Sequence, residues 1–196
     1  PVKIEAAITP RTKAILLAHI FGQSCDMTKI MKIAERYKLK VIEDACESIS
    51  ATHYGKNIGT FGDVAVFAFY PNKQMTTGEG GMIVTNNEKI HEYCKSTANQ
   101  GRSDNMQWLT HDKLGFNYRM NEMSAAVGVA QVRKIGSFIT KRKKIAQYYI
   151  DHFKEIPEIR VPSIRSENES SWFGFPIKVK EKIRDQVIEK LKEKGI

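Results

Sequence analysis

The most constraining feature of the sequence is a pair of short buried-strand patterns separated by the length of one helix. Residues 14–20 (AILLAHI) and 40–44 (KVIED) are both short and apolar enough for buried strands. Between them, Asp26 precedes apolar side chains that recur at helical spacing as far as about Lys38, and Asp is a favoured helix N-cap. Strand, helix and strand within roughly 30 residues predict a βαβ unit with parallel strands and a right-handed crossover.

The rest of the chain continues an α/β pattern. Further strands are expected over residues 64–70, 81–85 and 173–179. Helices are expected over residues 88–97, from Asn121 to about Phe153, and over residues 182–194. The remaining segments predict a loop over 52–62, an ordered loop over 98–118, and a polar linker over 163–171 that is a candidate domain boundary. In the long helix, Gly128 or Gly136 marks close packing or a kink, because glycine costs about 1 kcal/mol there.

Composition places the chain among ordinary globular proteins. Of its 196 residues, 41% are hydrophobic and 27% charged, which excludes a disordered tail or a rod. The dense apolar stretches are far shorter than the ~20 residues that a membrane helix needs. Three scattered cysteines without a CxxC motif argue against a disulfide scaffold or a zinc finger, and favour a reducing cytoplasm.

The net charge of +9 is unevenly distributed, with six basic residues and no acid in residues 133–144. Three interpretations of this run stay open. The first and preferred interpretation is a solvated helix face. The second is a positive field that attracts a phosphorylated small molecule, and the third is a nucleic-acid-binding surface.

Two expected strands end in charged residues. Glu43, Asp44 and Glu47 close one strand, and Lys73 follows another, just before a glycine-rich loop. Because ligands of open α/β sheets bind beyond the carboxyl ends of the strands, an acid and the lysine are expected to converge on one cleft. The alternative is a surface ion pair between Asp44 and Lys73, worth under about 1 kcal/mol.

Four motifs extend this interpretation: VIEDACES, FGDVAVFAFYPNKQMTTGEGGMIVTNN, NQGR and HDKLGFNYRMNEMSAAVGVAQ. In this order and spacing the chain resembles the DegT/StrS-like sugar-nucleotide aminotransferases, which depend on pyridoxal 5′-phosphate (PLP) and belong to the fold-type-I aspartate aminotransferase superfamily. The resemblance runs from about Ile8 to Phe153, and more loosely through WFGFPIKVK. It implies an α/β fold with a mostly parallel sheet flanked by helices, followed by a long helix and the start of a small α+β domain.

The same resemblance divides the chain and marks it as an internal fragment. Residues 1–120 are expected to be part of the large PLP-binding domain, 121–156 a connecting helix, and 157–196 part of the small domain. Family members are about twice as long, so we expect the N-terminal part and the end of the small domain to be missing.

The resemblance also implies roles for residues at the two strand ends. Lys73 matches the lysine that forms a Schiff base with PLP, and Asp44 matches the acid that keeps the pyridine ring protonated, which makes the ring a better electron sink. Glu47 stands where the family often has Gln or His against the ring hydroxyl. Ala68 replaces a Ser that commonly binds the cofactor phosphate, so one phosphate contact is absent.

Other candidates lie further along the chain. Asn117 matches an asparagine that reaches the phosphate of the neighbouring subunit's cofactor, which implies a homodimer with shared active sites. Arg119 has two interpretations, contact with a substrate diphosphate or a structural role at a helix start. His19 and His111 are candidates for lining the cleft, against the plainer alternative of hydrogen-bonded structural residues. No histidine spacing predicts a metal site.

The function implied is a cytoplasmic transferase that moves an amino group from an amino acid, glutamate, to a nucleoside-diphosphate keto-sugar for surface-polysaccharide or secondary-metabolite synthesis. Lys73 favours transamination, because a dehydratase branch of the family carries His at this position. No nucleic-acid or membrane partner is expected. The alternatives are a non-catalytic fragment or scaffold domain that retains the fold without holding PLP, and a basic nucleic-acid binder, which would show steep salt dependence.

Overall fold

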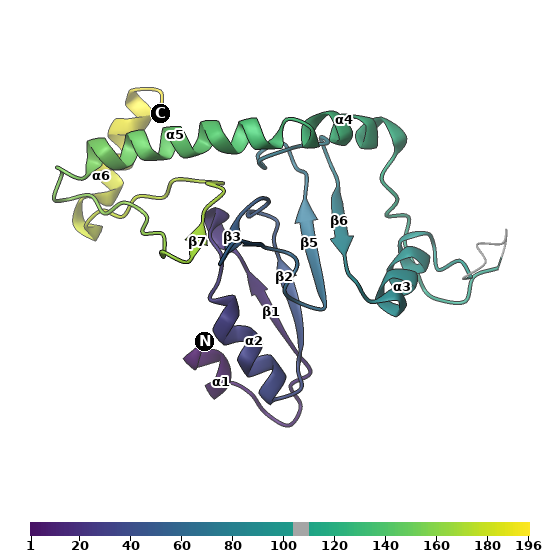
Figure 1. Cartoon of the computed structure of the whole chain (residues 1–196). Helices are drawn as coiled ribbons and strands as arrows, with labels where there is room; N and C mark the ends of the chain where they lie inside the picture. Colours follow the sequence, from purple (N-terminus) through teal and green to yellow (C-terminus); the bar gives the residue numbers. More distant parts are fainter. Residues whose placement is uncertain (104–109) are drawn as a thin grey trace.

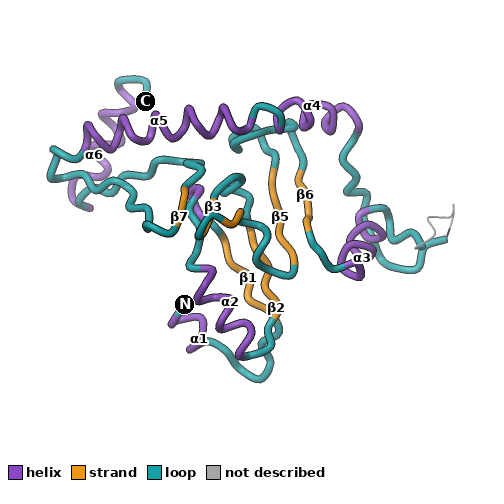
Figure 2. Tube along the Cα trace, viewed as in Figure 1, coloured by secondary structure: helices purple, strands orange, loops and turns teal. Residues whose placement is uncertain are grey.

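A four-stranded sheet organises the N-terminal half of the chain (Figures 1 and 2). The computed structural model describes residues 1–103 and 110–196. The strands, in the spatial order β1-β2-β5-β6, are β1 Ala14–Ala18, β2 Lys40–Asp44, β5 Val64–Ala68 and β6 Gly81–Val84. The first three strands are parallel and β6 is antiparallel to β5, which confirms the mostly parallel sheet.

The predicted βαβ unit is present and forms the core. Helix α2 (Met27–Arg36) joins β1 to β2, and the Asp26 carboxylate accepts a hydrogen bond from the Lys29 backbone N–H as its N-cap. The apolar face of α2 is buried against one face of the sheet. A short helix that the sequence pattern does not predict, α1 (Val2–Ala6), adds Ile4 to the edge of this core.

The two faces of the sheet differ in burial. In β1, Ile15 and Leu17 are each 7% exposed, whereas Leu16 between them is 70% exposed. Alternation along a strand sends neighbouring side chains to opposite faces, so the odd-numbered residues of β1 and β2 face the core. The same alternation directs Glu43 into the core and Asp44 to the open face.

The helical segment expected from Asn121 to about Phe153 is two helices, α4 (Glu122–Val132) and α5 (Ile135–Phe153), which run end to end along one edge of the molecule (Figure 1). The helix is interrupted at residues 133–134 and not at either glycine. Gly128 instead permits close packing, since a Cβ there would lie 3.0 Å from the Thr77 methyl group. The other late helices are α3 (Glu88–Ala98) and α6 (Glu181–Glu193).

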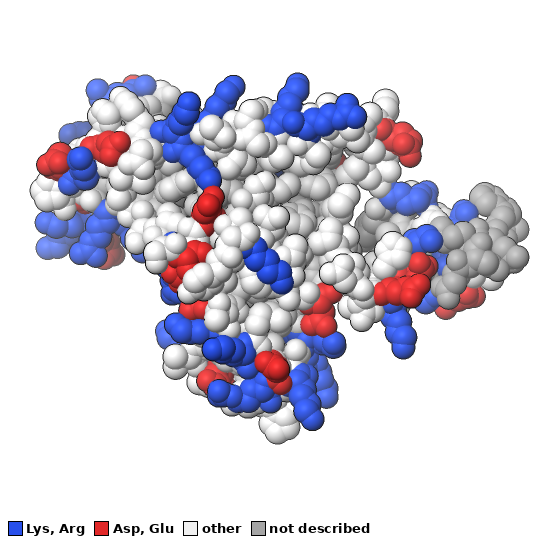
Figure 3. All heavy atoms as spheres, viewed as in Figure 1, with Lys and Arg blue, Asp and Glu red and all other residues white. Residues whose placement is uncertain are grey.

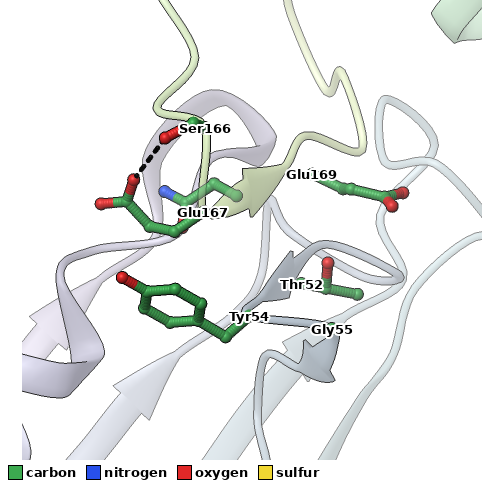
Figure 4. A pocket seen from close by; sticks show the side chains of 7 residues that line it. Thr52, Tyr54, Gly55, Ser166, Glu167 and Glu169 are labelled. Atoms are coloured by element: carbon green, nitrogen blue, oxygen red, sulfur yellow. Dashed lines mark hydrogen bonds between the residues drawn. The ribbon is translucent and has the colours of Figure 1, made fainter.

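Two expectations for the connecting segments are wrong. The presumed loop over residues 52–62 contains β3 (Thr52–His53) and β4 (Lys56–Asn57), and the presumed linker contains β7 (Asn168–Glu169), which pairs with β3. The His53 ring donates to the Asn168 side-chain oxygen over 2.7 Å and fixes this pairing. A shallow polar hollow lies between the β3–β4 hairpin and β7 (Figure 4).

The strand expected over residues 173–179 is also absent. In the part of the chain that the structure describes, this segment makes only an isolated bridge, between Arg160 and Lys178. Two prolines and a glycine nearby limit a regular ladder, because proline lacks an N–H donor.

The basic run of residues 133–144 lies on and just before α5, and Figure 3 shows Lys and Arg side chains projecting along that edge. Two of its members make internal contacts. Lys143 pairs with Glu169 at 2.7 Å, and Arg142 donates to the carbonyls of Trp172 and Phe173 at 3.0 and 3.1 Å. Among the described helices, none has both the length and the apolar content to cross a membrane.

Candidate active site

Lys73 and Glu47 meet beyond the carboxyl ends of β5 and β2. The Lys73 ammonium lies 3.8 Å from the Glu47 carboxylate, and the two side chains are 15% and 29% exposed. The ammonium also lies 4.6 Å from the centre of the Phe173 ring, a cation–π contact. The two strand ends therefore converge as expected, but the ion-pair partner of Lys73 is Glu47 and not Asp44.

Asp44 ends β2 on the open face of the sheet, three residues before Glu47. Its carboxylate accepts a hydrogen bond from the Cys46 backbone N–H at 3.0 Å, which closes the turn after the strand. Burial, reinforced by the Asp44 carboxylate, raises the pKa of the Cys46 thiol to about 12, while Lys73 acts in the opposite direction. Cys46 is thus a neutral thiol within the electrostatic field of the three charged residues.

Glu43, expected at the rim, is instead fully buried beneath it. Its carboxylate accepts three backbone hydrogen bonds, from Gly59, Phe61 and Gly62 at 2.9, 2.8 and 2.7 Å, and contacts His19 Nε2 at 3.1 Å. Burial alone would raise the pKa of Glu43, but these hydrogen bonds outweigh it and hold the pKa below its ordinary value. Glu43 fixes the loop after β4 and is not a cleft residue.

His19 belongs to the same buried network. Its Nδ1 accepts the Cys25 backbone N–H at 3.0 Å, so Nε2 carries the proton that it donates to Glu43. The residue is 1% exposed. With both ring nitrogens engaged inside the protein, the structure favours the structural alternative for His19 over cleft lining.

A segment near the C-terminus covers the Lys73 site. Residues 170–174, here called the strap, pack against the loops that follow β1 and β5. Gln74 Nε2 donates to the Glu47 carbonyl at 2.6 Å and to Ser171 Oγ at 2.9 Å, so it joins the strap to the site. The Gln74 side-chain oxygen is buried and has no hydrogen-bond partner among the residues that the structure describes. The sequence motif WFGFP gave no sign of this contact.

The strap crosses the turn after β1 at close range. Ser171 N donates to the Gly22 carbonyl at 2.9 Å, and a Cβ on Gly22 would lie 2.6 Å from Trp172 N. Next to this glycine, Phe21 has a φ of 58° and its N–H donates to the second Glu47 carboxylate oxygen at 2.8 Å. Glu47 therefore bridges the Phe21 turn and Lys73.

The other expected site residues lie on the segment between α3 and α4. Asn117 forms a backbone bridge with Asn99 and is exposed, and the Arg119 guanidinium donates to the Asn99 side chain. His111 Nδ1 donates to the Gln100 carbonyl at 2.9 Å. Within the described residues, no hydrogen bond or ion pair joins these side chains to Lys73. They tie this segment to the end of α3.

A relative of known name matches nearly the whole chain. GDP-perosamine synthase of Caulobacter vibrioides is 38% identical over 198 residues, an alignment that covers 99% of this chain and 53% of that protein. The chain thus spans about half the length of this relative.

Solved structures match the fold equally well. An E. coli GDP-4-keto-6-deoxy-D-mannose-3-dehydratase with bound hydrated PLP is 33% identical, with a TM-score of 0.91, over 100% of this chain and 55% of that one. A mutant of GDP-4-keto-6-deoxymannose-3-dehydratase (ColD) with bound GDP-perosamine is also 33% identical, with a TM-score of 0.91, over 98% of this chain and 54% of that one. The model of the DegT/DnrJ/EryC1/StrS aminotransferase family matches residues 1–196, and the chain belongs to this family.

Proposed function

We propose that this chain carries the lysine-bearing part of a PLP-dependent sugar-nucleotide aminotransferase. The observation that carries the proposal is the ion pair between Lys73 and Glu47 beyond the ends of the adjacent parallel strands β5 and β2, with Asp44 as the last residue of β2. Family membership and the 38% identity to a GDP-perosamine synthase support it. The acceptor would be a nucleoside-diphosphate keto-sugar, and the donor an amino acid, glutamate.

The residues present fit PLP. Lys73 offers a partly buried primary amine for the aldehyde carbon, and Asp44 offers a carboxylate for the pyridine nitrogen. The buried, unpartnered Gln74 oxygen is a further acceptor within the site. When bound, PLP supplies an electron sink for a carbanion on the substrate. This chain's own residues would orient it: Asp44 holds the ring, and Lys73 moves a proton at the substrate carbon.

Lysine at position 73 also bears on the reaction type. The two solved relatives described above are dehydratases, whereas the named sequence relative is a GDP-perosamine synthase. A primary amine can bind PLP covalently and can move protons, and the resemblance places His at this position in the dehydratase branch. Lys73 therefore favours transamination.

We further propose a homodimer that covers the segment around Asn117. Phe116 and Tyr118, which flank it, are stacked with ring centres 5.0 Å apart and are 54% and 73% exposed. Leu114 is 88% exposed on the same segment. An exposed apolar patch of this kind marks a protein interface, and a second copy seated there would receive Asn117 at its own site.

The test is a PLP titration followed by borohydride reduction and peptide mapping. One reduced adduct on Lys73 is expected, and Lys73→Arg should abolish it, whereas the same substitution at an exposed lysine of α6, Lys190→Arg, should not. An adduct on other lysines, or none, contradicts the proposal and favours the scaffold alternative. Turnover of a GDP-linked keto-sugar with glutamate, lost in Lys73→Ala, tests the reaction itself.

A further inference from the structure

Besides Glu47, an aromatic ring of the strap contacts the Lys73 ammonium. Lys73 Nζ lies 4.6 Å from the centre of the Phe173 ring, within the distance at which an aromatic face attracts a cation. The Lys73 side chain is 15% exposed and Phe173 is half-buried, so little water competes for the charge. The ring therefore favours the ammonium over the neutral amine and restricts where the amine lies.

Phe173 reaches Lys73 because the strap bends at this point. Trp172, the residue before it, has a φ of 51°, in the left-handed region that bulky residues rarely adopt. Such a conformation is costly and persists only where the surrounding contacts hold it. On one side of the bend, the Ser171 N–H donates to the Gly22 carbonyl at 2.9 Å. The position of the ring then depends on what holds the other side.

Arg142 of α5 holds the other side of the bend. Its guanidinium donates to the Trp172 carbonyl at 3.0 Å and to the Phe173 carbonyl at 3.1 Å. One planar, rigid group therefore grips both the strained residue and the residue that carries the ring. The neighbouring Lys143 instead forms an ion pair with Glu169 at the surface. Arg142 is thus the member of this pair of basic residues whose contacts lead towards Lys73.

Side-chain packing around the bend is incomplete. Trp172 stacks on Phe175 with ring centres 5.7 Å apart, and the Phe175 ring lies 5.2 Å from that of Tyr149 on α5. A hollow of about 140 Å³ remains between these rings, Arg142 and Phe173. The hollow gives the bend room to relax, so aromatic packing alone does not fix the Phe173 ring. The two Arg142 hydrogen bonds supply the missing constraint.

We propose that Arg142 and Phe173 are positioning residues for Lys73. Arg142 holds the bend of the strap, and the bend holds the Phe173 ring against the amine. While Lys73 carries the proton that it moves at the substrate carbon, the ring and the Glu47 carboxylate, which lies 3.8 Å away, keep the ammonium in place. This role in the reaction rests on the proposed function, whereas the contacts themselves are testable without the cofactor.

The experiment measures how fast formaldehyde and cyanoborohydride methylate the Lys73 amine at pH 8, as read by peptide mass spectrometry. The neutral amine is the nucleophile, so a contact that favours the ammonium slows the reaction. Phenylalanines that carry one, two and three ring fluorines at position 173 weaken the attraction of the ring for a cation with little change in shape. The rate at Lys73 should rise stepwise, to about threefold with three fluorines. The rate at Lys190, an exposed lysine of α6, should stay unchanged.

Arg142→Met tests the second contact, because it removes the guanidinium and keeps most of the stem. In this variant the rate at Lys73 should no longer respond to the fluorines, since the ring is no longer held against the amine. Arg142→Lys, which keeps one donor group, should retain part of the response and guards against a folding defect. The matched control is Lys144→Met, which removes the same charge from an exposed residue of α5 and should leave the full response.

A rate at Lys73 that ignores the fluorines in the unsubstituted background would overturn the role of Phe173. An undiminished response in Arg142→Met, or an equal loss in Lys144→Met, would overturn the role of Arg142. Borohydride mapping of the PLP adduct in the same samples separates this inference from the proposed function. A fluorine response without an adduct on Lys73 contradicts the proposed function and leaves the contacts standing, whereas an adduct without a fluorine response does the reverse.

Discussion

Substitution of Glu43 by Gln is the sharpest test of how this fold is held together. Each Glu43 oxygen accepts two hydrogen bonds: one from the Phe61 and Gly62 N–H groups, the other from Gly59 N–H and His19 Nε2–H. Gln has the same shape but only one accepting oxygen, so in either orientation two buried donors face an NH₂ group. A buried donor left without an acceptor costs about 1–3 kcal/mol. With two such donors, Glu43→Gln should lower the free energy of unfolding by about 3 kcal/mol.

Equilibrium unfolding in urea at pH 7 measures this loss as a lower midpoint at unchanged slope. The control is Glu169→Gln, since the Glu169 side chain is 66% exposed and, among the described residues, its carboxylate pairs only with the half-exposed Lys143. The control should change the free energy of unfolding by no more than about 0.5 kcal/mol. A Glu43→Gln variant as stable as this control would refute the reasoning that the carboxylate anchors the loop.

The loss of stability in Glu43→Gln should also depend on pH. The pKa of Glu43 is held below its ordinary value of 4.5 in the folded chain, because hydrogen bonds to the carboxylate outweigh burial. Since the folded pKa is the lower one, the unfolded chain takes up the proton first as the pH falls, and the stabilisation is lost. The difference in unfolding free energy between wild type and Glu43→Gln should be full at pH 7 and should shrink below pH 4.5. A difference that grows in acid would contradict this sign.

Three further predictions concern the turn after β1, the site thiol and the exposed apolar segment. Gly22→Ala should cost at least about 2 kcal/mol in urea unfolding, because φ is +86° and the new Cβ would lie 2.6 Å from Trp172 N; a neutral result would mean that the strap is not tightly packed. Burial raises the pKa of Cys46 to about 12, so iodoacetamide at pH 8 should modify it at least about a hundredfold more slowly in the native than in the urea-unfolded chain, as peptide mass spectrometry would report; equal rates would argue against the buried thiol. Tyr118→Asp should halve the mass found by sedimentation velocity, whereas Tyr54→Asp, a tyrosine that is also 73% exposed, should leave it unchanged; equal masses would argue against the dimer face.

The central elements of the fold are predictable because their signals are local. Short apolar runs specify β1, β2 and β5, and Asp26 marks the start of α2 within one turn. The small sheet is not predictable in this way. Strands of two residues have no periodicity, and β3 pairs with β7 through a His53–Asn168 contact across 115 positions. The linker-like composition of residues 163–171 reflects their polarity and not a lack of structure.

The candidate site was predictable only in part, for a similar reason. Strand ends and motif order pointed to Lys73, Asp44 and Glu47, and the structure brings Lys73 and Glu47 together. Glu43 does not lie at the expected rim, because alternation along β2 sends its side chain inward, to the face opposite that of Asp44. The strap was missed because its contacts with Gln74 join positions 97 residues apart.

That separation has a consequence for the nascent chain. At about 5–20 residues per second, the ribosome needs roughly 6 to 23 s to go from His53 to Asn168, the pair that fixes β3 to β7. Over this interval β3 has no partner on its β7 side, and the strap that later covers Lys73 does not yet exist. The lysine is translated early and enclosed late, so its amine is open to solvent and to cellular aldehydes until residues 170–174 have been made.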